Sequence, residues 1–291
     1  MKTRLRLVAF VAALACVFLV FFKTKTKTPT IAGFVKSDIE EVLKITGLTY
    51  DGTISDLVAV TQKGWLRPAH QERWEIQEHP YEKKRDQLLP VFVRMGLVNA
   101  MELTKSSYDH ILFMRATVFS MNSRMEKLKE VVSHLASYHD IALLSGCRYL
   151  VQGEREFLEK RGWTNLPETE AGALKRLFEE SLTFSDKVVL IDSPQKKSLD
   201  GVMVRPTTAD TVEDWLKTQP KKGTVLVISS QPFCHYQRIV TESLLPCTFV
   251  VDVVGAQSPE NTTMAVYLDM LARTLYQWNN GNKCAQKNEK K

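Results

Sequence analysis

The part of the chain after residue 108 alternates between short apolar runs and longer amphipathic stretches. The runs are rich in branched apolar residues and show no regular alternation of apolar and polar positions. Strands that are buried on both faces have this character, because helices cover both sides of a parallel sheet. We therefore predict buried strands at His110–Thr117, Ile141–Arg148, Lys187–Ser193, Thr224–Ser230 and Cys247–Gly255.

The amphipathic stretches between and after these runs have apolar residues at helical spacing. They predict helices at Ser123–Tyr138, Glu154–Arg161, Thr169–Thr183, Thr208–Thr218, Phe233–Leu244 and Glu260–Trp278. Strands joined in sequence by right-handed helical crossovers form a parallel sheet with helices on both faces. The fold class expected for residues 105–279 is therefore α/β, a doubly wound, mainly parallel five-stranded Rossmann-like three-layer sandwich.

Residues 29–104 lack this rhythm and predict a small helical region packed on the α/β body. Ser37-Asp-Ile-Glu40 has the pattern of a capping box that begins a helix. The apolar segment Leu57–Thr61 predicts either a short strand or a buried segment of another kind. Pro68–Met101 is charged and helical in character, which suits a cap or subdomain.

The N-terminus carries a targeting signal. Basic residues precede an unbroken apolar run over residues 7–22, which would extend about 24 Å as a helix, against a bilayer core of roughly 30 Å. Local thinning and lysine snorkelling can accommodate that mismatch. The bulky end at Phe18–Phe22 favours a signal anchor over a cleaved signal peptide, which needs a small-residue cleavage site. We expect residues 1–28 to be a transmembrane anchor and tether, and the globular domain to lie on the extracytoplasmic (periplasmic) side, although positive charge on both flanks leaves the orientation open.

Composition narrows the classes of function. The net charge of +6 is modest, and much of it lies near the two ends, including a basic tail at residues 280–291 that we expect to be disordered. A basic face with interleaved aromatic residues is absent from the sequence, so we expect no nucleic-acid partner. The 5 cysteines show no zinc-ligand spacing, and we expect neither a metal nor a cofactor. Cys234 and Cys247 could form a disulfide or remain buried thiols.

Several arginines follow the predicted strands at or just beyond their carboxyl ends, where open α/β sheets bind ligands. A guanidinium group binds phosphate or carboxylate through a fixed fork of N–H donors. The sequence thus predicts an anion site at this edge of the sheet; the alternative is that the arginines are solvated and pair with acidic residues. The candidate ligand-binding residues are Arg115, Arg124, Ser145, Gly146, Arg205, Thr208, Ser230 and Arg238.

His235 is a candidate general acid or base, because the charge of histidine changes near neutral pH. Glu170 or Asp210 could assist it. Each also has a structural interpretation: both acids lie where a helix N-terminus favours them, and His235 could be a hydrogen-bonded residue near a helix start. A G-x-S-x-G elbow is absent from the sequence, which argues against a hydrolase triad.

Five segments appear in an order that resembles a known family. They are the first strand leading to Arg124, then Leu144-Ser-Gly-Cys147, Glu168-Thr-Glu-Ala171, Arg205-Pro-Thr-Thr-Ala-Asp-Thr211, and Val227-Ile-Ser-Ser230 leading to His235-Tyr-Gln-Arg238. Over roughly residues 109–256 the chain resembles the YdcF/SanA/ElyC family of bacterial envelope-associated proteins, a domain of unknown function. It departs from the family at Met114-Arg-Ala-Thr117, where members have a glycine-rich strand end, and at Cys147, where they have a second glycine. The resemblance implies a Rossmann-like fold and a role in the cell envelope, without implying a reaction.

Three functions are compatible with this pattern. The leading hypothesis is a membrane-anchored protein, held by residues 7–22, that binds an anionic or phosphorylated small molecule in envelope biogenesis or barrier maintenance. Candidate ligands are a nucleotide, S-adenosylmethionine or a lipid-carrier phosphate. The alternatives are a metal-independent transferase or phosphate-ester hydrolase acting on an envelope precursor, and a non-catalytic scaffold that engages an envelope partner through Pro68–Met101.

Overall fold

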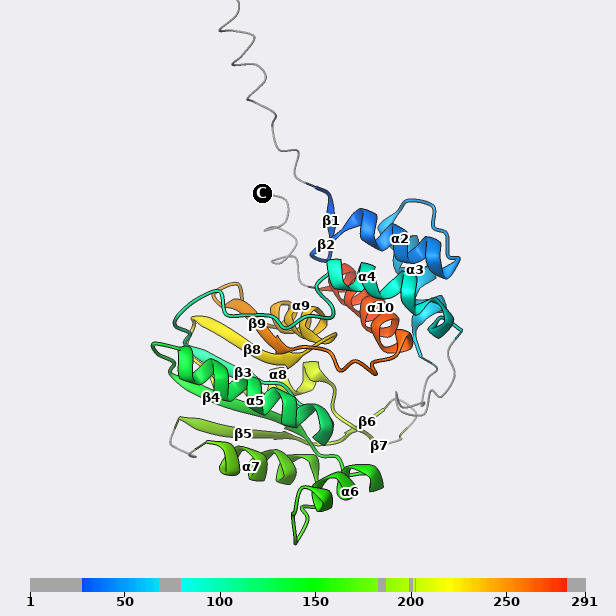
Figure 1. The fold of residues 1–291 in the computed structure, drawn as a ribbon. Helices are drawn as coiled ribbons and strands as arrows, with labels where there is room; N and C mark the ends of the chain where they lie inside the picture. The colour runs from blue at the N-terminus through cyan, green and yellow to red at the C-terminus, as the bar shows by residue number, and fades with distance from the viewer. Residues whose placement is uncertain (1–27, 68–79, 183–186, 199–200, 202, 282–291) are drawn as a thin grey trace, which may run out of the picture.

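The computed structural model describes residues 28–67, 80–182, 187–198, 201 and 203–281. Its centre is a parallel sheet of five strands in the order β5-β4-β3-β8-β9 (Figure 1). The strands are β3 (His110–Phe113), β4 (Asp140–Gly146), β5 (Val188–Ser193), β8 (Thr224–Ser230) and β9 (Val250–Ala256). The five strands predicted from the apolar runs are confirmed, and so is the α/β class of the fold, but β5, at one edge of the sheet, is mostly half-buried or exposed instead of buried.

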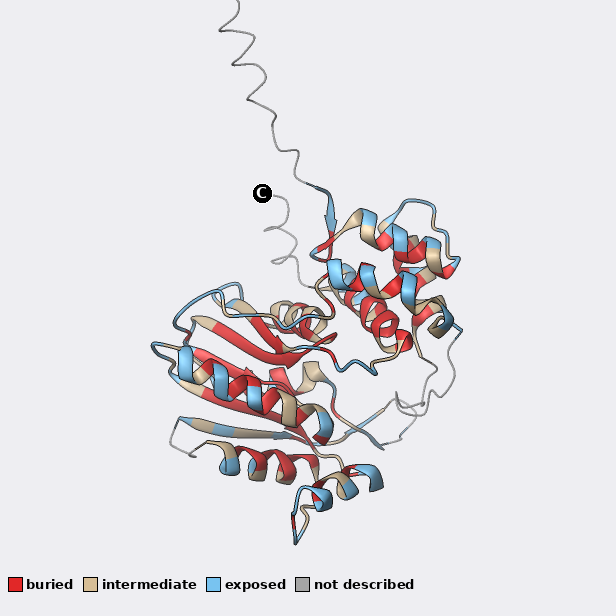
Figure 2. Cartoon of the chain, in the orientation of Figure 1, coloured by how far each residue is buried: buried red, intermediate tan, exposed pale blue. Residues whose placement is uncertain are grey.

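Helices cover both faces of this sheet. α5 (Val118–His134), α6 (Gln152–Lys160) and α7 (Glu170–Ser181) lie on one face, and α8 (Thr208–Leu216) and α9 (Cys234–Leu244) lie on the other. Successive side chains along β3 and just after it point to opposite faces of the sheet: Ile111 and Phe113 pack with α5 and α7, whereas Leu112 and Met114 pack with α8 and α9. Because both faces are covered at the centre of the sheet, β3, β4 and β8 are almost wholly buried, as Figure 2 shows by the buried colour along the central strands.

The order of the strands reverses at β3. From β3 the chain proceeds to β4 and β5 on one side, and it returns to place β8 and β9 on the other side. The connections that leave β3 and β8 therefore run to opposite faces of the sheet. In such sheets the carboxyl ends of the two central strands part and leave a crevice between them.

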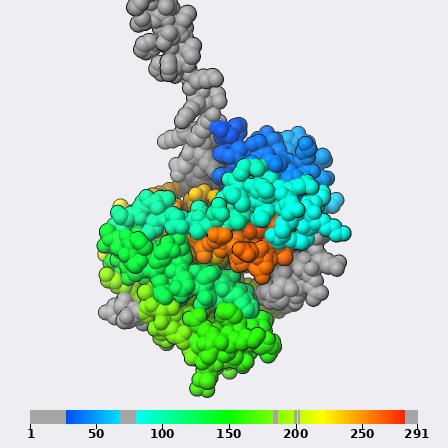
Figure 3. Space-filling model, in the orientation of Figure 1, coloured from blue at the N-terminus to red at the C-terminus, as the bar shows by residue number. Residues whose placement is uncertain are grey.

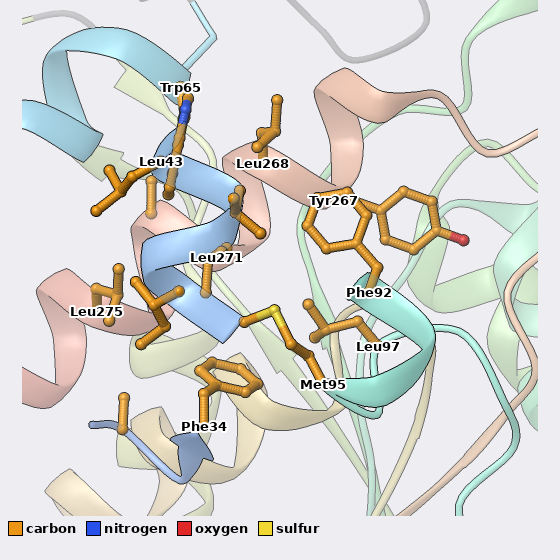
Figure 4. Close-up of a cluster of buried hydrophobic side chains, with 14 of the residues drawn as sticks. Phe34, Leu43, Trp65, Phe92, Met95, Leu97, Tyr267, Leu268, Leu271 and Leu275 are labelled. Atoms are coloured by element: carbon orange, nitrogen blue, oxygen red, sulfur yellow. The ribbon is translucent and has the colours of Figure 1, made fainter. Parts of the chain in front are cut away.

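Four helices form a second layer beside the sandwich: α2 (Lys36–Thr46), α3 (Ile54–Trp65), α4 (Arg85–Arg94) and α10 (Met264–Asn280). Their buried faces share one apolar cluster, drawn in Figure 4. The rings of Phe92 and Tyr267 stack in it with centroids 5.0 Å apart, and Trp65 is 1% exposed. The last helix of the chain thus completes the core of the helices near its beginning.

Smaller elements join these layers. There are two short antiparallel strand pairs: β1 (Thr30–Ile31) pairs with β2 (Phe34–Val35), and β6 (Lys196–Lys197) pairs with β7 (Met203–Val204). A 3-10 helix, η2, covers Glu82–Lys84.

Two predictions for the N-terminal region are corrected by the structure. The segment Leu57–Thr61 is not a strand but lies inside α3, whose buried residues Leu57, Val58, Thr61 and Trp65 follow helical spacing. Ser37 does not cap its helix, because α2 begins at Lys36 after the N-cap residue Val35, which has no side chain able to accept a hydrogen bond. The chain enters this helix directly from β2.

Some predictions fall outside the described residues: the anchor and most of its tether (1–27), residues 68–79 of the expected helical segment, and residues 282–291 of the basic tail. Within the ranges that are described, no helix has the length and apolar character needed to cross a membrane.

A buried histidine lies at the opposite, amino-terminal edge of the sheet. His110, 1% exposed, has its Nδ1 atom 2.9 Å from the carboxylate of Asp140 and its Nε2 atom 2.7 Å from the carbonyl oxygen of Lys221. Both partners accept hydrogen bonds, so both contacts exist only when the ring carries two protons. Burial opposes that charge, but the hydrogen bonds to Asp140 and Lys221 and the charge of Asp140 raise the pKa of His110 above its ordinary value.

We therefore expect His110 to make the stability of the fold depend on pH. A group whose pKa is raised by folding stabilises the protein fully below its unfolded pKa, about 6.5 for histidine, and this contribution disappears as the pH rises through the folded pKa. Urea unfolding of the wild type from about pH 6 to about pH 9 should show this loss, and His110→Gln should lack it. His134→Gln, at an exposed position of α5, is the control. Equal pH slopes for His110→Gln and the wild type would contradict the assignment.

Candidate functional site

A cleft of about 580 Å³ opens at the carboxyl edge of the sheet. Its lining comes from the loop after β3, the start of α5, the loop before α8, the start of α9 and the outer face of α10. In Figure 3 the orange surface that includes the start of α10 lies between the cyan atoms of the α4 region and the green atoms of the α/β body. The lining includes six arginines: Arg67, Arg115, Arg124, Arg148, Arg205 and Arg273.

Arg124 closes the floor of the cleft at the point where the strand order reverses. The side chain is 2% exposed and reaches back from α5 to the end of β3, where Nη1 donates to the carbonyl oxygens of Met114 at 2.9 Å and Arg115 at 2.7 Å. Nε donates to Oγ of Ser230, the last residue of β8, at 3.1 Å. One guanidinium thus joins the carboxyl ends of both central strands.

Arg115 and Arg148 belong to a buried ionic network. Nε of Arg148 donates to Glu170 at 2.9 Å, while its two terminal nitrogens donate to Glu154 at 2.7 and 2.8 Å. Nε of Arg115 donates to the other oxygen of Glu170 at 3.3 Å, and Nη1 donates to the carbonyl oxygen of Pro206. Glu154 and Glu170 are almost completely buried, at 0% and 1% exposed. Two arginines and two glutamates therefore neutralise one another beside the cleft.

Backbone amides complete the network. The carboxylate of Glu154 accepts hydrogen bonds from the amides of Val118 and Val151, both at 3.0 Å, at the beginnings of α5 and α6. Burial alone would raise the pKa of Glu154, but the Arg148 hydrogen bonds and these amides hold it below its usual range. A single carboxylate consequently fixes two helix N-termini and one arginine.

The smaller candidate residues lie near this network in different roles. Thr208 lines the cleft. Gly146 ends β4 where a Cβ atom would lie 2.4 Å from Cγ of Pro206, so only glycine allows the Pro206 loop to pack there. Ser145 is fully buried, and its Oγ has no hydrogen-bond partner among the described residues. Ser230 contributes its hydroxyl to Arg124 instead of to a ligand.

Asp210 caps the start of α8, which is the structural interpretation that the sequence also allowed. Its carboxylate accepts from the amide of Thr207 at 2.6 Å, while Thr207 Oγ1 accepts from the amide of Asp210. Lys196 also donates to this carboxylate. Burial tends to raise the pKa of Asp210, but the hydrogen bonds from Lys196 and Thr207 lower it overall.

His235 and Arg238 are not part of the cleft, and the grouping of His235 with Glu170 and Asp210 is not formed. The ring of His235 packs against Phe34 of β2 with centroids 4.7 Å apart. Burial, with a smaller contribution from Arg238, lowers its pKa to about 4. Arg238 forms an ion pair with Glu242 at 3.6 Å and lies close to Gly33.

The register of α9 explains this correction. Residues 233, 236 and 237 share the face that lines the cleft, whereas residues 235 and 238 share a face that meets the N-terminal hairpin. Sequence proximity to the end of β8 was therefore a misleading guide for His235 and Arg238.

The structure adds residues that the sequence reasoning missed. Arg67 follows α3, and Arg273 lies on α10; both belong to the helical layer, which no motif connected with the sheet edge. Phe233 and Tyr236 add aromatic surface to the lining. One signal was present: Val266 and Arg273 are seven residues apart and so share one helical face that is not needed for the core.

The chain matches no protein-family model, and no match is found for it among curated proteins. The resemblance to the YdcF/SanA/ElyC family therefore rests on the quoted motifs and stays a prediction.

The cysteines near the sheet do not pair with each other. Cys234 is a free, buried thiol whose pKa is raised to about 12 by burial, whereas Cys247 is disulfide-bonded. The first of the two alternatives, a bond between Cys234 and Cys247, is thus not formed.

We expect Glu170→Gln to destabilise the fold. The substitution leaves Arg115 and Arg148, which are only 12% and 11% exposed, with one remaining carboxylate, which should lower the free energy of unfolding by about 3 kcal/mol. Glu179→Gln is the matched control on the same helix, because Glu179 is 47% exposed and 3.9 Å from Lys175. Its effect should stay below about 0.5 kcal/mol in the same urea titration. Equal effects of the two substitutions would show that the buried network contributes nothing specific.

Proposed function

We propose that this protein binds an anionic, phosphorylated small molecule in the cleft at the carboxyl edge of its sheet. The observation that carries the proposal is that six arginines line one cleft, where the carboxylates paired with Arg115, Arg148 and Arg273 are those of Glu154, Glu170 and Asp269. Guanidinium groups bind phosphate through paired N–H donors, and an excess of them concentrates anions in a cleft.

The size of the cleft suits such a ligand. Thr117, Thr207 and Thr263, the N-cap residues of α5, α8 and α10, also line it. Amides at these three helix starts already donate to carboxylates of the protein, namely those of Glu154, Asp210 and Glu82. The volume of about 580 Å³ falls within the roughly 300–1,000 Å³ typical of small-molecule sites.

Among the candidate ligands, the charge of the lining favours phosphate groups. A nucleotide or a lipid-carrier phosphate brings the negative charge that the arginines attract. S-adenosylmethionine carries a positively charged sulfonium and suits this lining less well. The aromatic side chains of Phe233 and Tyr236 provide apolar surface for the remainder of such a molecule.

Binding is better supported than catalysis. The transferase or hydrolase alternative relied on His235 as the proton carrier, and His235 packs under the N-terminal hairpin. Glu170, its proposed assistant, is held by Arg115 and Arg148. The scaffold alternative gains no support from a particular contact.

We further propose that residues 7–22 anchor the protein in a membrane, with the α/β domain on the extracytoplasmic side and a role in the cell envelope. The support is the apolar run with its basic flanks, the resemblance to envelope-associated proteins, and the disulfide at Cys247. Disulfides persist in oxidising compartments and are rare in the cytosol.

Arg205→Ala tests the binding site. Removing one charge-assisted contact should weaken the binding of a phosphate ligand about 10- to 100-fold. Isothermal titration with adenosine diphosphate and with undecaprenyl phosphate in detergent measures this. Arg94→Ala, at a 48% exposed arginine of α4 that pairs with Glu41, is the control and should bind like the wild type. The proposal fails if the wild type binds neither phosphate compound, or if Arg205→Ala binds as tightly as the wild type.

The anchor has its own test. The full chain should sediment with membranes and resist extraction by high salt, whereas a chain lacking residues 1–28 should be found in the supernatant. Retention of the truncated chain on membranes through the same salt wash would contradict the anchor.

A further inference from the structure

The helical layer supplies one wall of the cleft. On α10, Thr263, Val266 and Arg273 line the cleft, while the opposite face of the helix packs in the apolar cluster. The backbone amide of Arg67 donates to Asp269 of α10 at 3.3 Å, which places Arg67 on the same wall. Neither arginine belongs to the α/β sandwich.

Arg273 is held so that its guanidinium stays accessible. Nε donates to the buried carboxylate of Asp269 at 3.0 Å, and 31% of the side chain remains exposed. Burial opposes the charge of Arg273, but Asp269 and the nearby phenol of Tyr236 raise its pKa overall. The guanidinium is thus held at Nε by Asp269, while the side chain lines the cleft and stays partly exposed.

A different wall carries its own cationic groups. Arg205 lies in the loop that leads into α8, next to Pro206, whose carbonyl oxygen accepts from Arg115. This loop belongs to the α/β body, because Pro206 packs on the end of β4 at Gly146. The cleft therefore has cationic side chains on two walls that come from two different layers.

The wall along α10 is long. From Thr263 to Arg273 the helix rises about 15 Å at 1.5 Å per residue. The cleft volume of about 580 Å³ compares with roughly 30 Å³ for one water molecule, so a lone phosphate ion would leave most of it empty. Two aromatic residues also line the cleft: Tyr236 and Phe233, whose ring centroid lies 5.8 Å from the Arg124 guanidinium.

Cationic side chains on two walls suit a ligand that has an anionic group near each wall. We propose that the ligand of this cleft is an elongated molecule with two separated anionic groups, such as a bisphosphate. Arg205 holds one anionic group on the α/β wall, and Arg273 with Arg67 holds the other on the helical wall. The uncharged middle of the ligand lies along Val266, Phe233 and Tyr236. This inference rests on the proposed function and specifies its ligand class.

Synthetic probes of matched length test it. Hexane-1,6-diyl bisphosphate and hexyl phosphate differ in the second phosphate, and the butane and octane bisphosphates vary the separation. In isothermal titration of the full chain, the best-fitting bisphosphate should bind at least about tenfold more tightly than hexyl phosphate. The preference should depend on the length of the bisphosphate.

Variants of each wall locate the two groups. Arg273→Ala should remove the preference for the bisphosphate over hexyl phosphate, whereas Arg94→Ala should retain it. Arg67→Ala, on the same wall, should also reduce the preference for the bisphosphate. This variant replaces Arg273→Ala in the test if the loss of the partner of Asp269 prevents Arg273→Ala from folding. Circular dichroism of each variant checks folding.

The outcomes separate this inference from the proposed function. Equal binding of bisphosphate and monophosphate, with both weakened by Arg205→Ala, would overturn the two-ended ligand and leave the anion site intact. A bisphosphate preference that survives both Arg273→Ala and Arg67→Ala would also overturn it. Absence of binding by every phosphate probe would overturn both proposals.

Discussion

The Arg124 guanidinium lies where β3 and β8 part, and the carboxyl edge of the sheet is organised around it. A charged group buried to this degree is stable only if neighbouring acceptors replace the water it has lost. Here the carbonyl groups of residues 114 and 115 and the hydroxyl of Ser230 do so. Because these acceptors come from both central strands, satisfying Arg124 also fixes the path of the loop after β3. That path sets the position of Arg115, and through Glu170 that of Arg148.

The arginines of the cleft therefore have two different roles. Arg115 and Arg148 are neutralised by Glu170 and Glu154, and their contribution is to hold helix N-termini and loops against the sheet. Arg273 is fixed from one side by Asp269 and remains partly exposed on the cleft wall. The positions of the arginines in the sequence do not distinguish these roles, because the roles depend on which carboxylates pair with each arginine in the folded protein.

The sequence predicted the strands well because burial on both faces leaves an unmistakable apolar run, as in Thr224–Ser230, where prediction and structure coincide. It predicted the convergence of Arg115, Arg124 and Arg205 because parallel strands place their carboxyl ends at one edge. It misplaced His235, since one residue of helical register separates the cleft face of α9 from the face under the hairpin. It could not assign Arg273, because the pattern of a helix does not tell which layer the helix joins.

The position of α10 has a consequence for biosynthesis. The N-terminal helices bury Trp65 and Phe92 against a segment that leaves the ribosome about 170 or more residues later, well after the sheet has been made. Contacts between such distant segments form late, since the intervening chain must first be ordered. Until then a nascent chain displays the apolar face of α2, α3 and α4 to its surroundings. Holding these helices soluble during translation is thus a task for chaperones.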